Sequence, residues 1–379
     1  MRHQNSVFHQ VLKQVPWAAF DRLVKEHGAD ARERGFKTKT QLLAMIYAQL
    51  CGAVSLRDIE ARLGSQQARL YHLGMGPVRR STLGEANAHR PVEVFAELFA
   101  LLVSQASRSL RRKFDGLTYL IDSTALALNG LSARWARFSA GVCGAKVHVI
   151  YAPDADQPVY AAVSSANRND ITAAKAMPIT AGATYVFDLG YYDFGWWNQL
   201  DGAGCRIVTR LKRNTPLREV EERPVPPGSN IVGDRIGYLP ARRPGRRNPF
   251  VKKVREILVK IDTGKVLRIL TNDLDAAAQE IADLYKRRWA IELFFRWVKQ
   301  TLQITRFFGT SENAVRIQIA TALITFLLLR LAQASQTALT SPLAFARLVS
   351  ANLMERRDLR ALAAPEQPIP INPNQLAFL

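Results

Sequence analysis

The sequence of 379 residues has few cysteines and no long hydrophobic run. Cys51, Cys143 and Cys205 lie far apart and fit no CxxC or Cys/His metal spacing, so we expect buried thiols in a reducing cytosol. The N-terminus is polar, which argues against a signal peptide. The most apolar run, residues 317–329, is too short to span a bilayer and predicts a core helix. We therefore expect a soluble protein without a membrane partner.

Acidic residues are scarce relative to basic ones. The chain has 52 Lys and Arg against 32 Asp and Glu, a net charge of +20 with a pI near 10.3. Such an excess indicates a polyanionic partner, with nucleic acid ahead of an anionic membrane. Residues 206–270 hold 17 basic and 6 acidic side chains, more than half of the net charge. This segment therefore predicts a dedicated polyanion-binding face.

The first 113 residues have a helical pattern throughout, and the chain is long enough for two or three domains. A helix at 40–50, a glycine-containing turn and a helix at 55–63 form a helix-turn-helix pattern, with Ser55 and Asp58 as a capping box. The pattern predicts an all-helical N-terminal DNA-binding domain. A helical bundle without DNA contact remains the alternative.

A second basic feature of this region is the pair Arg79 and Arg80. They precede a short helix at 83–89 that Thr82 and Glu85 can cap. A helix N-terminus just behind two arginines suits contacts with phosphate groups. We predict that this pair contacts DNA.

The pattern changes to short apolar runs after residue 116, which is typical of buried strands. We expect a mixed sheet with helices, an α/β fold, with strands at 117–121, 146–151, 159–164, 184–187 and 206–211 and helices at 170–177 and 194–202. The expected domains are a helical unit at 1–113, a core at 114–211, a basic β-rich insertion at 212–272, core helices at 273–340 and a tail at 341–379.

Residues 284–300 contain no Pro or Gly and predict one helix. At about 100° per residue, four polar side chains fall within an arc of roughly 60°: Tyr285, Arg288, Glu292 and Lys299. The neighbouring arc is apolar and can pack into a core. The alternative is a surface helix in which Arg288 and Glu292 form an ordinary i,i+4 pair.

Two aspartates follow predicted strands. Asp122 comes after the first strand and Asp188 after the fourth, and each alone could cap the following turn. Together with Glu292 they make three convergent carboxylates, which cannot all ionise cheaply without a divalent cation. Oxygen ligands without His or Cys favour a hard ion, Mg²⁺ or Mn²⁺.

These residues resemble the DDE transposases of bacterial insertion sequences, in the group with a Y-x2-R-x3-E-x6-K signature. All four signature positions and all three gaps match at Tyr285, Arg288, Glu292 and Lys299. Asp122 in LIDST resembles the first acid of the family, and Asp188 in DLGYYD the second. Asn169 and Asp170 resemble a recurrent pair between these two acids, for which we assign no role.

The resemblance implies an RNase H-like core in which Asp122, Asp188 and Glu292 hold two Mg²⁺ ions, with Mn²⁺ as a substitute. It also implies that Arg288 and Lys299 hold phosphate oxygens, and that synapsis of the element's ends needs at least a homodimer on double-stranded DNA. No small-molecule substrate is expected.

Further contacts with DNA are predicted beside the signature. Tyr285 would donate to a phosphate near the scissile bond. Trp289 is a candidate for stacking on a displaced base, with packing inside the core as the alternative. In the basic insertion, we expect phosphate contacts from Arg242, Arg243, Arg246 and Arg247.

The predicted function is a transposase that binds the inverted-repeat ends of an insertion sequence, cleaves them hydrolytically and joins the 3′-OH ends to target DNA. It would lie in the cytoplasm with the nucleoid of a bacterium. The alternatives are a catalytically silent DNA-binding regulator and a metal-dependent nuclease without strand transfer.

Overall fold

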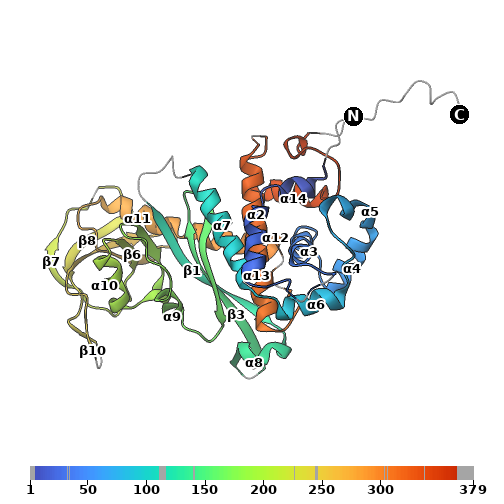
Figure 1. Ribbon diagram of the computed structural model, residues 1–379. Helices are drawn as coiled ribbons and strands as arrows, with labels where there is room; N and C mark the ends of the chain where they lie inside the picture. Colours follow the sequence, from blue (N-terminus) through green and yellow to red (C-terminus); the bar gives the residue numbers. More distant parts are fainter. Residues whose placement is uncertain are drawn as a thin grey trace, which may run out of the picture.

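The computed structural model describes residues 5–364 except 32, 34, 111–116, 140, 226, 244–245, 303, 305 and 337. A mixed sheet occupies one side of the described chain, and a cluster of helices occupies the other (Figure 1). The predicted α/β fold class, with an all-helical N-terminal region, is therefore confirmed. The proline-rich end of the predicted tail, 365–379, lies outside the described residues.

Three parallel strands form the centre of the sheet: β1 (Thr118–Leu128), β5 (Thr184–Phe187) and β6 (Arg206–Arg210). Three antiparallel strands extend it on the β1 side: β2 (Arg137–Ser139), β3 (Val142–Ala152) and β4 (Gln157–Ser165). The expected meander of three strands is thus present, with β3 in its middle. The register continues beyond the apolar run of β1, because β3 pairs with β1 as far as Leu128.

The basic insertion extends the same sheet on the other side. Its strands are β7 (Arg218–Glu222), β8 (Ile231–Tyr238), β11 (Lys253–Lys260) and β12 (Val266–Thr271), and β12 pairs antiparallel with β6. A small hairpin of β9 (Arg242–Arg243) and β10 (Arg246–Arg247) stands apart from this sheet. The predicted β-rich character is confirmed, whereas the predicted domain boundaries remain predictions.

Helices cover both faces of the sheet. One face is covered by α9 (Asp170–Ala174) and α10 (Phe194–Gly202). Trp196 and Trp197 of α10 lie there in one buried cluster with Ile121 and Phe187 of the sheet. On the other face lie α11 (Ala278–Arg287), α12 (Trp289–Thr301) and α13 (Glu312–Ala334). Alternate residues of the central strands thus face different cores, as the pleat requires.

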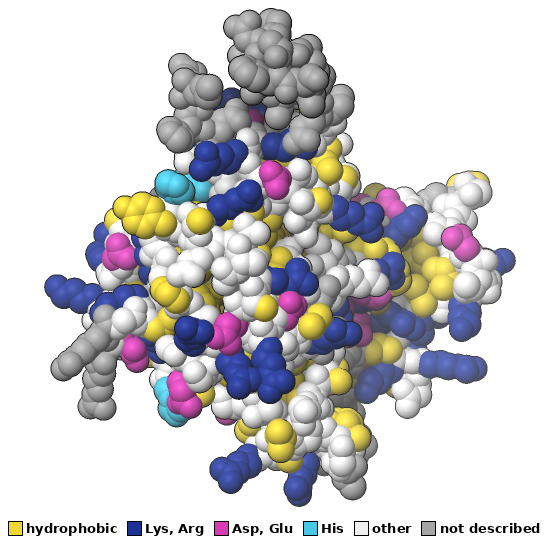
Figure 2. Space-filling view, turned by 90° about the vertical axis from the view of Figure 1, so that its right-hand side faces the viewer, with side chains coloured by type: hydrophobic (Ala, Val, Ile, Leu, Met, Phe, Trp, Pro, Cys, Tyr) yellow, Lys and Arg dark blue, Asp and Glu magenta, His cyan; other side chains and the backbone are white. Residues whose placement is uncertain are grey.

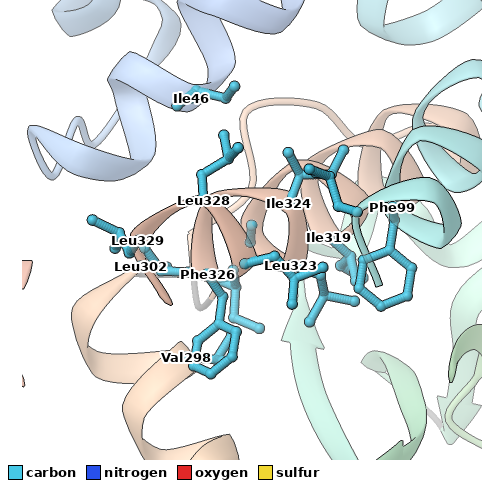
Figure 3. Packing of buried hydrophobic residues seen from close by; sticks show 14 of the residues in the cluster. Ile46, Phe99, Val298, Leu302, Ile319, Leu323, Ile324, Phe326, Leu328 and Leu329 are labelled. Atoms are coloured by element: carbon cyan, nitrogen blue, oxygen red, sulfur yellow. The ribbon is translucent and has the colours of Figure 1, made fainter. Parts of the chain in front are cut away.

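The helical side is built around α13. The N-terminal helices are α1 (Val7–Leu12), α2 (Trp17–Glu26), α3 (Thr38–Leu50), α4 (Leu56–Ser65), α5 (Gln67–Leu70), α6 (Arg80–His89) and α7 (Glu93–Leu110). Figure 3 shows side chains of α13 meeting Ile46 of α3, Phe99 of α7 and Val298 of α12. Among the described helices, α13 is long and apolar enough to cross a membrane, and 78% of its apolar window is buried in the structure. The burial is that of a core helix.

Three expectations about helices need correction. Residues 341–364 are not a tail, because α14 (Pro342–Ala351) packs against α3 and α13 and the Phe8 amide donates to the Leu353 carbonyl. Helix α6 begins at Arg80, so Thr82 lies inside it and does not cap it. The helix expected at 284–300 is two helices that meet at Arg288, whose own backbone stays helical with φ −52° and ψ −28°.

Candidate active site

The sheet places Asp122 and Asp188 side by side. Ile121 of β1 pairs with Phe187 of β5 in parallel register, and each aspartate is the next residue along the chain. Neighbouring strands lie about 4.8 Å apart, so the two carboxylates belong to one site. The sequence predicts Asp122 at the end of the first strand, but β1 continues past it to Leu128. Asp122 instead follows the last residue of β1 that pairs with β5.

Glu292 of α12 belongs to the same site, because Arg288 contacts both Glu292 and Asp122. The Arg288 Nη2 donates to Glu292 Oε1 at 2.6 Å, and its Nη1 lies 3.5 Å from Asp122 Oδ2. The guanidinium therefore lies between the two carboxylates. The side chains of Arg288, Asp122 and Glu292 are 18%, 19% and 31% exposed, so the bridge is partly buried but open to solvent. The structure thus brings the three predicted acids together: Arg288 joins Asp122 to Glu292, and Asp188 lies beside Asp122.

The Asp122 carboxyl has a pKa raised to about 6. Burial is the main cause, and the charges of Asp188 and Glu292 raise the pKa further, while the Ser123 amide and Arg288 lower it. The Ser123 amide donates to Asp122 Oδ1 at 2.8 Å. One guanidinium and one amide thus do not offset the repulsion among three acids and the cost of burial.

Asp188 is oriented by the turn that follows it. It caps the short helix Leu189–Tyr191, and its Oδ1 accepts from the Gly190 amide at 2.8 Å. A methyl group on Gly190 would lie 3.0 Å from Asp188 Oδ1 and 3.5 Å from Asp170 Oδ2, so a glycine leaves both oxygens their space. This explains why glycine follows the second acid here.

The donor set fits a hard divalent cation. Three carboxylates supply only oxygen ligands, which suit a hard ion, and the buried hydroxyl of Tyr191 lies near Asp122, Asp170 and Asp188. As they stand, no three acidic, His or Cys side chains of the described chain are arranged to hold a metal ion. In this arrangement the Arg288 guanidinium lies between Asp122 and Glu292.

The other signature residues lie on the same two helices as Arg288 and Glu292. Tyr285 is buried, and the Arg288 guanidinium carbon lies 5.8 Å from the centre of its ring. Burial raises the pKa of the Tyr285 hydroxyl. Lys299 lies about two turns beyond Glu292 on α12, half-buried, and burial lowers its pKa.

Trp289 is 50% exposed, so the alternative of packing inside the core is wrong. It lines a hollow of about 380 Å³ between α11, the start of α12 and the β11–β12 hairpin, together with Tyr285, Arg288, Lys260 and Lys286. The hollow is therefore walled by the signature helices on one side and by the insertion on the other.

The remaining predicted DNA contacts lie away from this site. Arg79 and Arg80 are exposed at the start of α6, at the opposite end of the molecule from the β9–β10 hairpin (Figure 1). Arg242 and Arg247 are exposed on that hairpin, whereas the side chains of Arg243 and Arg246 lie outside the described part. Figure 2 shows Lys and Arg spread over the face of the helical side that carries α4, α5 and α6. The two arginine groups cannot join the acids in one small site.

Sequence reasoning missed the residues behind the two aspartates. Asp170, which had no assigned role, accepts from Ser123 Oγ at 2.7 Å and from Lys146 Nζ at 3.0 Å. Ser123 lies next to Asp122, but Lys146 belongs to β3 and carries no motif. Only the recurrent Asn169–Asp170 pair in the sequence could have pointed to this group.

Comparison with known proteins identifies the family. Residues 113–328 match the model described as "Transposase DDE domain". The chain belongs to the DDE transposase family. It is therefore a DNA transposase, an enzyme that cleaves and transfers DNA in dependence on a divalent metal. Residues 3–76 match a domain of unknown function, DUF4372, which covers the helix-turn-helix pattern of this transposase.

Curated relatives agree over most of the chain. The transposase is 40% identical over 319 residues to a "Putative transposase y4zB" of Sinorhizobium fredii. The alignment covers 83% of this chain and 87% of the relative. It is 29% identical over 276 residues to a "Probable transposase for insertion sequence element IS5377" of Geobacillus stearothermophilus, with 71% of each covered. The chain is also similar to a solved piggyBac transposase synaptic complex with hairpin DNA, with a TM-score of 0.47 and 11% identity. The match covers 99% of this chain and 84% of that chain.

Proposed function

We propose that Asp122, Asp188 and Glu292 are the catalytic carboxylates of this transposase and that they hold two Mg²⁺ ions, for which Mn²⁺ can substitute. The observation that carries the proposal is the convergence of two strands and one helix. Asp122 and Asp188 follow paired residues of β1 and β5, and Arg288 joins Asp122 to Glu292. Bound ions would neutralise charge on the attacking and leaving oxygens of the phosphodiester.

The side chains of the protein then position the DNA. Arg288 exchanges its carboxylate partners for phosphate oxygens, which its planar fork can bind in two places. Lys299 adds a point charge further along α12. The Tyr285 hydroxyl donates a hydrogen bond to a phosphate near the scissile bond, and the exposed ring of Trp289 stacks on a displaced base within the adjoining hollow.

The same site serves cleavage and joining, since only the nucleophile changes. Water attacks the phosphodiester at the element's end, and the freed 3′-hydroxyl then attacks the target. We propose that the inverted-repeat ends are brought together by a homodimer, with the protein on the nucleoid. Exposed arginines at both ends of the molecule, Arg79 and Arg80 on α6 and Arg242 and Arg247 on the hairpin, support two separate contacts with a long duplex.

Single substitutions test the catalytic site. We expect Asp122→Asn, Asp188→Asn and Glu292→Gln each to lower end cleavage on the order of a thousandfold while DNA binding at fixed salt persists. Asp193→Asn is the control, because Asp193 caps α10 and pairs with Lys175 only five residues after Asp188. Unchanged cleavage in all three variants would exclude these residues as catalytic.

The alternatives predict different products. A silent regulator binds DNA but yields no cleaved ends with Mg²⁺, whatever the variant. A nuclease without strand transfer cleaves but leaves a supplied pre-cut 3′-OH end unjoined to a circular target. The proposal requires joined product from the wild-type protein and none from the Glu292→Gln variant.

A further inference from the structure

A network of polar side chains around Asp170 lies on the face of the sheet opposite to the candidate catalytic site. In the antiparallel pairing of β1 with β3, Ser123 is opposite His148, and Lys146 lies two residues before His148. Asp122 faces α12, so Ser123, Lys146 and His148 face α9 and α10 by the alternation of a strand. Asp170, the first residue of α9, meets them there.

One oxygen of Asp170 is fixed by several donors. Its Oδ1 accepts from the Ser123 hydroxyl at 2.7 Å and from Lys146 Nζ at 3.0 Å, and His148 Nδ1 lies 3.7 Å away. Lys146 also donates to the Arg168 carbonyl at 3.2 Å, which holds the ammonium group in place. The direction of the Asp170 carboxylate is therefore set by its surroundings rather than by solvent.

The other oxygen of Asp170 lies near the turn that holds Asp188. A Cβ atom added to Gly190 would lie 3.5 Å from Asp170 Oδ2 and 3.0 Å from Asp188 Oδ1, so both oxygens border Gly190. Ser123 makes the link to the first aspartate, because its amide donates to Asp122 while its hydroxyl donates to Asp170. Asp170 thus binds Ser123, whose amide donates to Asp122, and lies beside Gly190, whose amide donates to Asp188.

Two buried polar atoms border this network. The Tyr191 hydroxyl is 1% exposed and lies near Asp122, Asp170 and Asp188, and His148 Nδ1 is on a residue that is 0% exposed. Buried polar atoms are nearly always satisfied, by water where protein groups do not reach. Polar groups of the network lie close to both atoms: Ser123 to the Tyr191 hydroxyl and Asp170 to His148 Nδ1.

We infer that Asp170 is a positioning residue of the cation site: with Ser123 it fixes Asp122, and with its second oxygen it adds negative charge beside Asp188. The inference rests on the proposed catalytic role of Asp122 and Asp188. Residues that orient metal ligands typically change metal affinity by about 10- to 100-fold when they are removed. Asp170 would orient the ligand Asp122 in this way, through Ser123.

The test measures the cation directly, with Mg²⁺ alone added to the DNA-free full-length protein. The thermal midpoint is followed as the Mg²⁺ concentration rises, so that binding is separated from catalysis. We expect Asp170→Asn, which keeps the shape and an acceptor oxygen, to raise the half-maximal Mg²⁺ concentration by about tenfold or more. Asp193→Asn is the matched control, since Asp193 also forms a single Asp–Lys pair at 2.9 Å at the start of a helix.

Separate outcomes distinguish the inference from the proposal on which it depends. If Asp122→Asn and Asp188→Asn respond to Mg²⁺ as the wild type does, the proposed cation site is wrong. If those two lose the response but Asp170→Asn keeps the wild-type Mg²⁺ concentration, Asp170 has only a structural role and the inference is overturned. Should Asp170→Asn not fold, Ser123→Ala removes the hydroxyl link alone. It must then shift the Mg²⁺ concentration upward by severalfold, and a wild-type value would overturn the inference.

Discussion

The sheet of this transposase carries two arginine–carboxylate sites of opposite character. In the insertion, Arg255 binds Asp234 through two parallel bonds of 2.8 and 2.6 Å, and the two side chains are 4% and 3% exposed. At the candidate active site, Arg288 is shared between two acids at 2.6 and 3.5 Å, and its Nε has no partner among the described residues. The first site is complete and closed, whereas the second is shared and open.

The difference shows how one interaction type serves structure or function. A bidentate pair that matches every charge can be buried, and it then holds β8 to β11 in fixed register. A guanidinium that faces several carboxylates cannot satisfy them all, so the acids remain available to a cation and the arginine to a phosphate. Incomplete pairing, more than the presence of charge, marks the functional site.

The largest expected effect is on the closed pair. Arg255→Met leaves Asp234 buried without its cation, which typically costs about 3–5 kcal/mol in the free energy of unfolding. Arg288→Met removes a cation from acids that retain contact with solvent, so we expect a loss of about 1 kcal/mol or less. Denaturant unfolding of the metal-free protein measures both. Equal losses would contradict the division into a closed and an open site.

A second prediction concerns Asp122 in the metal-free protein. Its pKa is raised from 3.8 to about 6, so the folded state holds the proton more tightly than the unfolded state does. The cost of ionisation is absent below about pH 4, grows between pH 4 and 6, and is complete above pH 6. Asp122→Asn should therefore stabilise the protein by about 1–3 kcal/mol at pH 8 and by nearly nothing at pH 4. Unfolding curves at both pH values check this, and a gain that is equal at both would contradict it.

Much of this arrangement could be predicted from the sequence. Strand β5 (Thr184–Phe187) and helix α10 (Phe194–Gly202) begin and end at the predicted residues, because apolar runs and turn residues define them locally. The three acids were found by their place after strands and by the spacing of the signature. Their convergence follows from the parallel pairing of β1 with β5.

The features that were missed depend on contacts between distant segments. Strand β1 runs on to Leu128 because β3 pairs with polar residues that look like a strand end in sequence. Residues 341–364 join the helical core through contacts with α3 and α13, which no local pattern reveals. Lys146 and Asp170 meet because α9 packs against β3, and Ser123 joins them because β1 pairs with β3, so the network behind the acids appears in the structure alone.

A third prediction couples the raised pKa to the cation. Mg²⁺ binds the ionised carboxylate, so below about pH 6 it must displace a proton from Asp122. We expect the half-maximal Mg²⁺ concentration to be nearly constant above pH 7 and to rise by up to about tenfold per pH unit below pH 6. Calorimetric titration of the DNA-free protein measures it. In contrast, a constant Mg²⁺ affinity from pH 8 to 5 would mean that Asp122 does not bind the ion.

The smallest effect is expected from arginines that belong to neither site. Arg242 and Arg247 are exposed on the β9–β10 hairpin, and neutralising them together with Arg243 and Arg246 should flatten the salt dependence of DNA binding. Each lost phosphate contact lowers the slope of log K against log salt by about 0.9.

The matched control neutralises four cations that acids already engage: Arg206, Arg223, Arg235 and Lys252. The overall charge change is the same, so a general field effect would flatten both slopes equally. A contact at the hairpin flattens only the first, because paired cations release no counterions from DNA phosphates. Binding measured from about 50 to 200 mM salt separates the two. Equal slopes would place the main phosphate contacts elsewhere, with the exposed Arg79 and Arg80 of α6 as the next candidates.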